Sequence, residues 1–474
     1  MHLIWENLLK NLILHWTGEF KGLDDGTESY ELEKTMWRAI GEATARTGSM
    51  VPSAYGARVP NIAADGVYIS AEMWSFWALY LGPVLLRQRF KAVRYYDHFI
   101  RLVKLLNICL QFEISDNEIK ELQSGFALWV QDYERIYYQH DYNRLSTCPL
   151  TVHALLHIAD SIKATGPVWC YWAFPMERYC GTIQPAIHSR RHPFASLARH
   201  VLEDAQLTQI KIYYDVVDEL SLRPSQRTPA GSLQIQEYPT CRLLPPKAVK
   251  QPTSLAPVYG ALVTRLQHPL GTVKRYLQNA DIIEWGKVQR IDSDAGDTMR
   301  ASELGTIRDD SRDASWVRYE MLVDRHARRR NAAVNFVREM FYGQLQHIYV
   351  IHFGSPCLQL GLEDPETTFI LAAIRSCKCI ESEQIRGLDI HFYNSLGQLH
   401  VIDITAIQCL VGRVPCGENK WAVIDRSGTL ARAVVKPELE FIKLEEEHVK
   451  APSEINVQRN ELKSREALVF IFGL

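Results

Sequence analysis

The apolar residues change their spacing along the chain, and this change limits the folds that the sequence can adopt. Over residues 1–221 apolar side chains recur at helical intervals, whereas residues 258–434 contain short β-rich runs. Between them, residues 222–257 contain seven prolines and no periodic pattern, which predicts an extended linker. We therefore predict an α+β multidomain chain with a mainly helical N-terminal half. Residues 435–474 are polar and are predicted to be disordered.

Local signals place the boundaries of the predicted helices. Ser115 and Glu118 have the spacing of a capping box, and Gly82-Pro83 is expected to stop or kink the helix before it. We predict helices over 28–47, 70–81, 90–112, from Ser115 to about Ile136, from Thr147 to about Thr165, and over about 194–220. Their apolar stripes are interpreted as core positions.

The region after the linker contains runs that favour strands, separated by turn signals. These runs are Trp316–Leu322, Leu345–Phe353, Thr368–Ile374, Leu388–Tyr393, His400–Ile404, Ile407–Val414 and Trp421–Ile424. Turns are expected at Asn394–Gly397 and Pro415–Glu418. This spacing predicts a small β-barrel or β-sandwich.

Composition excludes several classes of protein. The 474 residues include 53 Lys and Arg against 55 Asp and Glu, so the chain as a whole is not a polycation. No apolar run is long enough for a membrane helix, and the first residues do not resemble a signal peptide. The ten cysteines form no CxxC pair and are expected to be reduced.

Residues 146–203 contain the most specific strings in the sequence: CPLTVHALLH, GPVWCYWAFPMERYCG and SRRHPFASL. The segment resembles the transposases of CACTA-type (En/Spm-like) DNA transposons, especially those of fungi. The opening MHLIWENLLKNLILHWTGEFKGLDDG, the string FYGQLQHIYVIHF and the string ITAIQCLVGRV are similar to the same proteins. The resemblance extends over most of residues 1–430.

The resemblance implies an RNase H-like nuclease domain interrupted by a helical insertion. Such enzymes hold two divalent cations, typically Mg²⁺, on two aspartates and a glutamate. Glu177 matches the position of the glutamate and is the candidate catalytic residue and Mg²⁺ ligand. An alternative is that Glu177 only interacts with a helix N-terminus, since Pro175 can occupy the first helical position. The two roles are compatible.

The resemblance assigns neither aspartate to this sequence. The opening motif of the family resembles Asp-x-Met-His-Leu, and here the chain starts at Met1-His2-Leu3. The matching aspartate would precede the start, and the other would lie further upstream. We therefore expect a C-terminal portion of a transposase, a relic or fragment that is catalytically incomplete as given.

A second group of residues could bind zinc. His153 and His157 are four residues apart and share one helical face, and Cys148 lies close by in the sequence. Cys170 or Cys180 could provide a fourth ligand. The alternative is a histidine pair in the core with a buried thiol. Three ligands without a clear fourth favour this alternative.

Two basic clusters are candidates for binding DNA phosphates. Arg190 and Arg191 follow the helix expected around Glu177, and a second cluster contains Arg328, Arg329 and Arg330. The second cluster could also be a nuclear import signal, so a nuclear location is expected. The alternative for both is a solvated surface.

Two functional hypotheses follow. The first is the transposase fragment, whose parent would cleave and join DNA at transposon ends. The second is a non-enzymatic protein that binds DNA or chromatin proteins through the helical platform and a barrel such as a BAH- or SH3-like module. Aromatic residues could form its binding surface, although packing in the core is favoured: Trp316, Tyr319, Phe341, Tyr342, Phe392 and Tyr393.

Overall fold

The structure is a computed structural model. The description covers residues 2–24, 28–189, 191–217, 219–220, 229–251, 255–291, 297–304, 312–326, 333, 335–364, 366–385, 387–428 and 430. The predicted disordered tail, residues 435–474, lies outside them. In these ranges no helix combines the length and the apolar character needed to cross a membrane.

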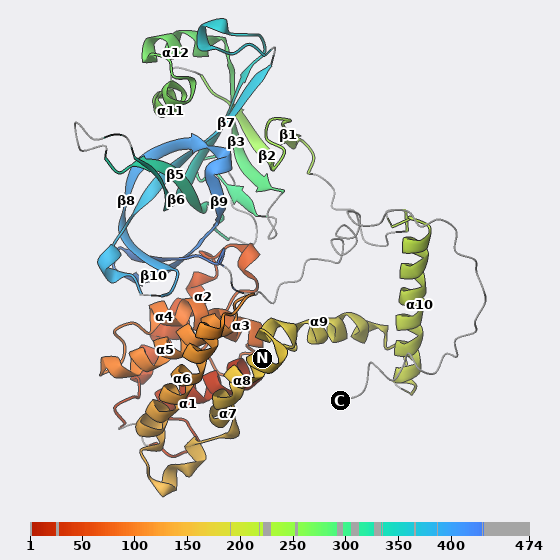
Figure 1. Ribbon diagram of the computed structural model, residues 1–474, viewed down its shortest axis with the longest axis vertical. Coiled ribbons are helices and arrows are strands. Elements are labelled where there is room, and N and C mark those ends of the chain that lie inside the picture. Colours follow the sequence, from red (N-terminus) through yellow and green to blue (C-terminus); the bar gives the residue numbers. More distant parts are fainter. Residues whose placement is uncertain are drawn as a thin grey trace. The chain divides into compact units, whose positions relative to one another are not determined.

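Helices make up the described part of the N-terminal half, as predicted (Figure 1). They are α1 (Leu9–Thr17), α2 (Lys34–Thr47), α3 (Ala71–Phe76), α4 (Gly82–Leu85), α5 (Val93–Cys109), α6 (Asp116–Tyr133), α7 (Leu150–His153), α8 (Ile158–Thr165), α9 (Phe174–Ile183) and α10 (Pro193–Tyr213). A π-helical turn over Trp77–Leu81 joins α3 to α4. The expected break at Gly82-Pro83 coincides with the boundary between this turn and α4, and Pro83 occupies the first turn of α4, where its missing N–H costs nothing.

An aromatic core holds these helices together. Trp16, Trp77 and Trp129 are almost completely buried, and Tyr133 and Tyr137 bring further rings against them. The expected capping box begins α6: the Ser115 hydroxyl accepts from the N–H of Glu118, and the Glu118 carboxylate accepts from the N–H of Ser115. The face of α6 that packs in this core carries the apolar stripe that the sequence predicted.

The described strands form one antiparallel sheet of eleven strands. They are β1 (Leu233–Gln234), β2 (Cys241–Val249), β3 (Asp281–Arg290), β4 (Thr298–Arg300), β5 (Trp316–Asp324), β6 (Phe336–Phe353), β7 (Thr367–Cys379), β8 (Ile390–Asp403), β9 (Ile407–Leu410), β10 (Gly412–Gly417) and β11 (Lys420–Ile424). The main order is β1-β2-β3-β6-β7-β8-β11-β10, with β4 on β3 and β5 between β6 and β9. The sheet is not closed, which corrects the predicted barrel or sandwich.

Both faces of the central strands are buried, which explains their nearly continuous apolar sequence. On β6, Ile348 and Val350 belong to one core, and Tyr349 and Ile351 belong to another on the opposite face. The helices α11 (Ala256–Leu266) and α12 (Leu270–Tyr276) cover the second face. Neither helix was predicted from the sequence.

Two further predictions about this region are wrong. Residues 233–249, which were assigned to the linker, form β1 and β2, and β2 pairs with β3 from Cys241 to Val249. The expected turn at Asn394–Gly397 lies inside β8, where Leu396 pairs with Cys377 of β7. The two separate strands predicted there are one strand.

The sheet and the helices share contacts, so the predicted domain boundary does not separate two independent bodies. The Tyr55 hydroxyl lies 3.0 Å from the carbonyl oxygen of Leu410 and 3.2 Å from that of Ile424. The Arg312 guanidinium donates to the carbonyl oxygen of Gly56 at 2.7 Å. Phe392 and Ile424 of the sheet belong to the same apolar core as the helices.

Candidate nucleic-acid interface

Glu177 lies in the first turn of α9, close to the N-terminal segment of the chain. Pro175 precedes it in that turn, as the sequence predicted, and a first-turn carboxylate is favoured by the helix dipole. Its Oε1 atom is 3.0 Å from Nε2 of His2, and the side chain is 48% exposed. The other ring nitrogen of His2 contacts the carboxylate of Glu6. One imidazole therefore links two carboxylates.

The described surroundings of Glu177 do not fit the predicted Mg²⁺ centre. Two Mg²⁺ ions need several carboxylate ligands, and no group of three or more His, Cys, Asp or Glu in the described ranges could hold a metal ion. Glu177 itself is engaged with His2. Its catalytic role therefore stays a prediction, and we derive no reaction step from it.

The two histidines predicted to bind zinc contact each other at the surface. Nε2 of His153 is 3.2 Å from Nε2 of His157, and both side chains are exposed, so they are not the buried pair considered as the alternative. Cys148 is half-buried, 3.9 Å from the Thr147 hydroxyl, and burial raises the pKa of its thiol. Cys170 and Cys180 are exposed. The described residues bring no third ligand to the histidines, and zinc remains a prediction.

Asp24 is an acid to which the sequence assigned no role, and it lies in a buried polar network. Its Oδ1 atom is 2.8 Å from Nη1 of Arg144 and accepts a hydrogen bond from the Tyr30 hydroxyl at 2.9 Å. Burial acts to raise the pKa of Asp24, but the interactions with His15, Arg144 and Tyr30 outweigh it and lower that pKa. This network stabilises the helical region and is closed to a ligand.

The segment from Trp169 to His200, here called the α9–α10 segment, has an unusual distribution of charge. Between Glu177 and Glu203 the sequence has four arginines and three histidines but no acid. Arg191 and Arg199 are exposed and Arg178 is half-buried, and none of them forms a salt bridge within the described ranges. The other predicted DNA contacts, Arg190, Arg328, Arg329 and Arg330, lie outside the described residues.

Exposed aromatic rings accompany these cations. In the α9–α10 segment Trp169, Tyr171, Tyr179 and Phe194 are 39%, 47%, 49% and 82% exposed. Helix α10 has no buried residue along its length. Cations that follow a backbone, combined with rings on which bases stack, are the elements of single-strand binding surfaces. The exposure of the rings was not predicted from the sequence, but the absence of acids between Glu177 and Glu203 was visible in it.

The aromatic residues considered for a binding surface on the sheet have a different environment. Five of the six are buried, and they are Trp316, Tyr319, Tyr342, Phe392 and Tyr393. Phe341 is half-buried and stacks on Tyr319 with ring centroids 5.7 Å apart. These rings pack in the core.

Residues 110–228 match the family model of a domain of unknown function, DUF4218. This domain is commonly found in transposase-like proteins. The match begins just before α6 and includes the α9–α10 segment and Glu177. No curated protein and no solved structure matches the chain.

Proposed function

We propose that the chain is part of a transposase of the CACTA type and that its α9–α10 segment binds DNA. The supporting observation is that arginines with no salt bridge in the described ranges and exposed aromatic rings occur together in this segment, inside the matched domain. Residues 178–202 contain no acid. Arginines give affinity through phosphates, and the rings add stacking when bases are unpaired. We expect the protein to act in the nucleus.

Cleavage and joining of DNA belong to this proposal only for the parent enzyme. Glu177 would supply one carboxylate, and its contact with His2 places it beside the N-terminal segment. A single carboxylate does not hold two Mg²⁺ ions. The chain as given is therefore proposed to bind DNA without cutting it.

A binding assay with matched charge variants tests the DNA contact. The variant Arg178→Ala/Arg191→Ala/Arg199→Ala removes three cations from the α9–α10 segment. Fluorescence anisotropy with a labelled single strand and a labelled duplex should show about tenfold weaker binding or more. If each arginine contacts one phosphate, the salt slope should fall by roughly 2 to 3.

The control removes the same charge elsewhere on the helical region. Arg38, Lys120 and Lys163 are exposed, and none forms a salt bridge within the described ranges. The triple variant Arg38→Ala/Lys120→Ala/Lys163→Ala should bind like the unchanged chain. Equal losses in both triple variants, or binding that does not respond to salt, would refute a specific role for the segment.

The ring contribution has its own readout. Phe194 is 82% exposed, so Phe194→Ala should leave the fold unchanged. Loss of one base–aromatic stack should weaken binding of the single strand by about fivefold or more while affecting the duplex little. An equal effect on both would argue against stacking.

A further inference from the structure

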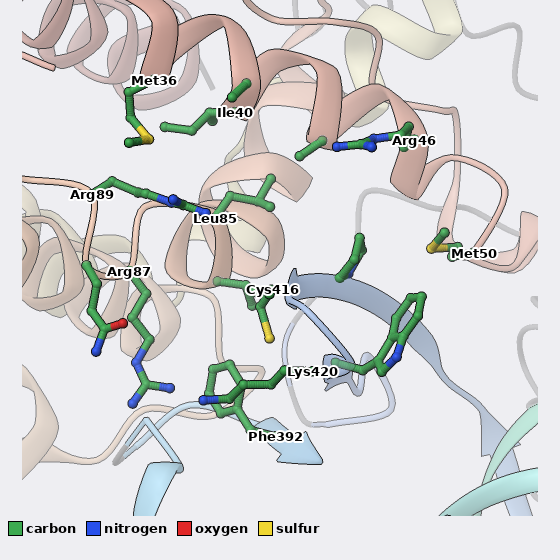
Figure 2. A pocket seen from close by; sticks show the side chains of 17 residues that line it. Met36, Ile40, Arg46, Met50, Leu85, Arg87, Arg89, Phe392, Cys416 and Lys420 are labelled. Carbon is green, nitrogen blue, oxygen red and sulfur yellow. The ribbon is translucent and has the colours of Figure 1, made fainter. Parts of the chain in front are cut away.

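A cavity of about 500 Å³ lies between the helical region and the sheet (Figure 2). One wall comes from α2 and from α4 with the residues that follow it, and the other from β8, β10 and β11. It contains no residue of the α9–α10 segment. The volume is in the range of small-molecule sites and is too small for a protein helix or a duplex.

Cations line both walls of the cavity, and no acid does. They are Arg46, Arg87, Arg89 and Lys420. Arg87 and Lys420 share one counter-charge: Oε2 of Glu383 lies 3.3 Å from Nη1 of Arg87 and contacts Nζ of Lys420. A hollow lined by one sign of charge concentrates ions of the opposite sign.

The other two cations have no such partner. Arg46 lies in the last turn of α2, and Arg89 follows α4, and both are exposed. Within the described ranges neither arginine forms a salt bridge. Their guanidinium groups are free to donate two parallel hydrogen bonds to a phosphate, the geometry that distinguishes arginine from lysine.

Apart from Gln88, the rest of the lining is mainly apolar. Figure 2 shows Ile40 and Leu85 on the helical side and Phe392 on the sheet side. The guanidinium of Arg87 lies over the ring of Phe392, 4.6 Å from its centroid. A stacked guanidinium presents a planar cationic face on which a base can stack.

We propose that this cavity binds a nucleoside monophosphate, with the phosphate at Arg46 and Arg89 and the base against the Arg87 guanidinium. The ligand class follows from three properties: an excess of arginine, a planar guanidinium beside apolar side chains and room for a single nucleotide. The same chemistry occurs in a free mononucleotide and in the 5′-phosphorylated end of a single strand. The site is separate from the α9–α10 segment, so either one can fail alone.

Calorimetric titration of the full chain with AMP and dTMP tests the site. Binding should occur at millimolar concentration or lower, and both adenosine and inorganic phosphate should bind about tenfold more weakly than AMP. The variant Arg46→Ala/Arg89→Ala should weaken AMP about tenfold, while Arg38→Ala on the same helix should have no effect. Absence of AMP and dTMP binding, or adenosine binding equal to AMP, would overturn the proposal.

A second pair of variants distinguishes the effect of an added negative charge in the cavity from the effect of filling its volume. Ala43 lines the cavity, and Ala43→Glu and Ala43→Gln add side chains of nearly equal size. The carboxylate should neutralise the arginines, so AMP should bind at least about fivefold more weakly to the Glu variant than to the Gln variant. Equal affinities would contradict phosphate recognition there.

A competition experiment distinguishes a free mononucleotide from the end of a DNA strand as the ligand. A 5′-phosphorylated trinucleotide that displaces AMP, when its unphosphorylated form does not, identifies a strand end as the ligand. AMP binding that the trinucleotide does not disturb identifies a free mononucleotide. Both results support the cavity, and both are independent of the Arg178, Arg191 and Arg199 variants.

Discussion

The hydroxyl of Tyr55 lies 3.2 Å from the carbonyl oxygen of Ile424, a residue of the last described strand. The same hydroxyl contacts the carbonyl oxygen of Leu410 and accepts a hydrogen bond from the N–H of Arg426 at 3.1 Å. Tyr55 is buried, so water cannot take the place of its hydroxyl as the hydrogen-bond partner of these backbone groups. The helical region and the sheet are therefore joined by a buried polar contact.

We expect Tyr55→Phe to lower the free energy of unfolding by about 1 to 3 kcal/mol, because it leaves buried carbonyl groups without a donor. Chemical denaturation measures this change. Tyr68→Phe is the matched control, since Tyr68 is 81% exposed, and it should change the free energy by less than about 0.5 kcal/mol. Equal stabilities of the two variants would contradict the joining role of Tyr55.

The Asp24–Arg144 ion pair should contribute strongly to stability. The Asp24 side chain is fully buried and that of Arg144 is 10% exposed, so Asp24→Asn leaves a buried cation without its closest counter-charge. Glu28, 4.0 Å from Nη1 of Arg144, is then the remaining carboxylate beside this cation. We expect a loss of about 3 kcal/mol near neutral pH, because the closer and fully buried partner is removed. Asp160→Asn, which makes the same change at an exposed site, should have little effect.

The pH dependence of this loss provides a second check. The folded pKa of Asp24 is lowered, so its contribution is complete above the unfolded pKa of about 4 and disappears as the pH falls through the folded value. The difference between Asp24→Asn and the unchanged chain should therefore narrow in acid. A difference that stays constant with pH would exclude the ionised carboxylate as its cause.

His98 should make the protein sensitive to mild acid. It stacks on Trp129 with centroids 4.4 Å apart, and its Nε2 contacts the Trp129 carbonyl oxygen at 3.2 Å. Burial lowers its pKa from 6.5 to about 4. Between these values the unfolded chain binds more protons, so stability falls as the pH is lowered.

We expect His98 to lower the free energy of unfolding of the unchanged chain by about 2 kcal/mol when the pH falls from about 7.5 to about 5. His98→Phe keeps the ring stack but cannot titrate. This variant should be less stable than the unchanged chain near neutral pH, and its free energy of unfolding should fall less in acid. Unfolding measured at both pH values tests this. His188→Phe, at an exposed site, should retain the full acid sensitivity.

Gly343 is required where β6 passes close to β7. A Cβ atom at this position would lie 2.6 Å from the carbonyl oxygen of Arg375 and 2.7 Å from Cγ2 of Ile374. We expect Gly343→Ala to destabilise the protein by about 1 to 3 kcal/mol, because neighbouring strands must move apart. At Gly354 the nearest atom to such a Cβ is 3.8 Å away, so Gly354→Ala should be nearly neutral in a thermal unfolding comparison.

Features fixed by neighbouring residues were predictable from the sequence. Ser115 and Glu118 form their capping box with each other, and Ser70 accepts from the N–H of Met73 at the start of α3. The helical character of this half could therefore be predicted, and the boundaries were most accurate where such a cap is present. These helix starts depend on hydrogen bonds between residues three positions apart, so they could be predicted without knowledge of distant residues.

Features fixed by distant partners could not be predicted. Asn394–Gly397 has the composition of a turn, yet pairing of Leu396 with Cys377 keeps the chain extended. Pro245 and Pro246 suggested a linker, but they occupy an irregularity in the pairing of β2 with β3, where a missing N–H is tolerated. Tertiary pairing outweighed the local signal in both cases.

The candidate sites show the same limit. The position of Glu177 in the first turn of a helix followed from Pro175, but its contact with His2 did not. The cavity joins residues from α2 to β11, so no local pattern indicated it. The basic character of the α9–α10 segment was partly visible, because its arginines are close together in the sequence.

The matched segment, residues 110–228, shares one apolar core with residues that precede it in this chain. Its α6 rings pack on residues that precede it: the Tyr133 hydroxyl contacts His15 at 3.1 Å, and Trp129 Nε1 donates to the His98 carbonyl oxygen at 2.9 Å. Cutting the chain at residue 110 would expose the aromatic face of α6 to water. The stretch that the family model covers is thus shorter than the stretch that packs together in this chain, so we expect a fragment that starts at residue 110 to lose part of its aromatic core.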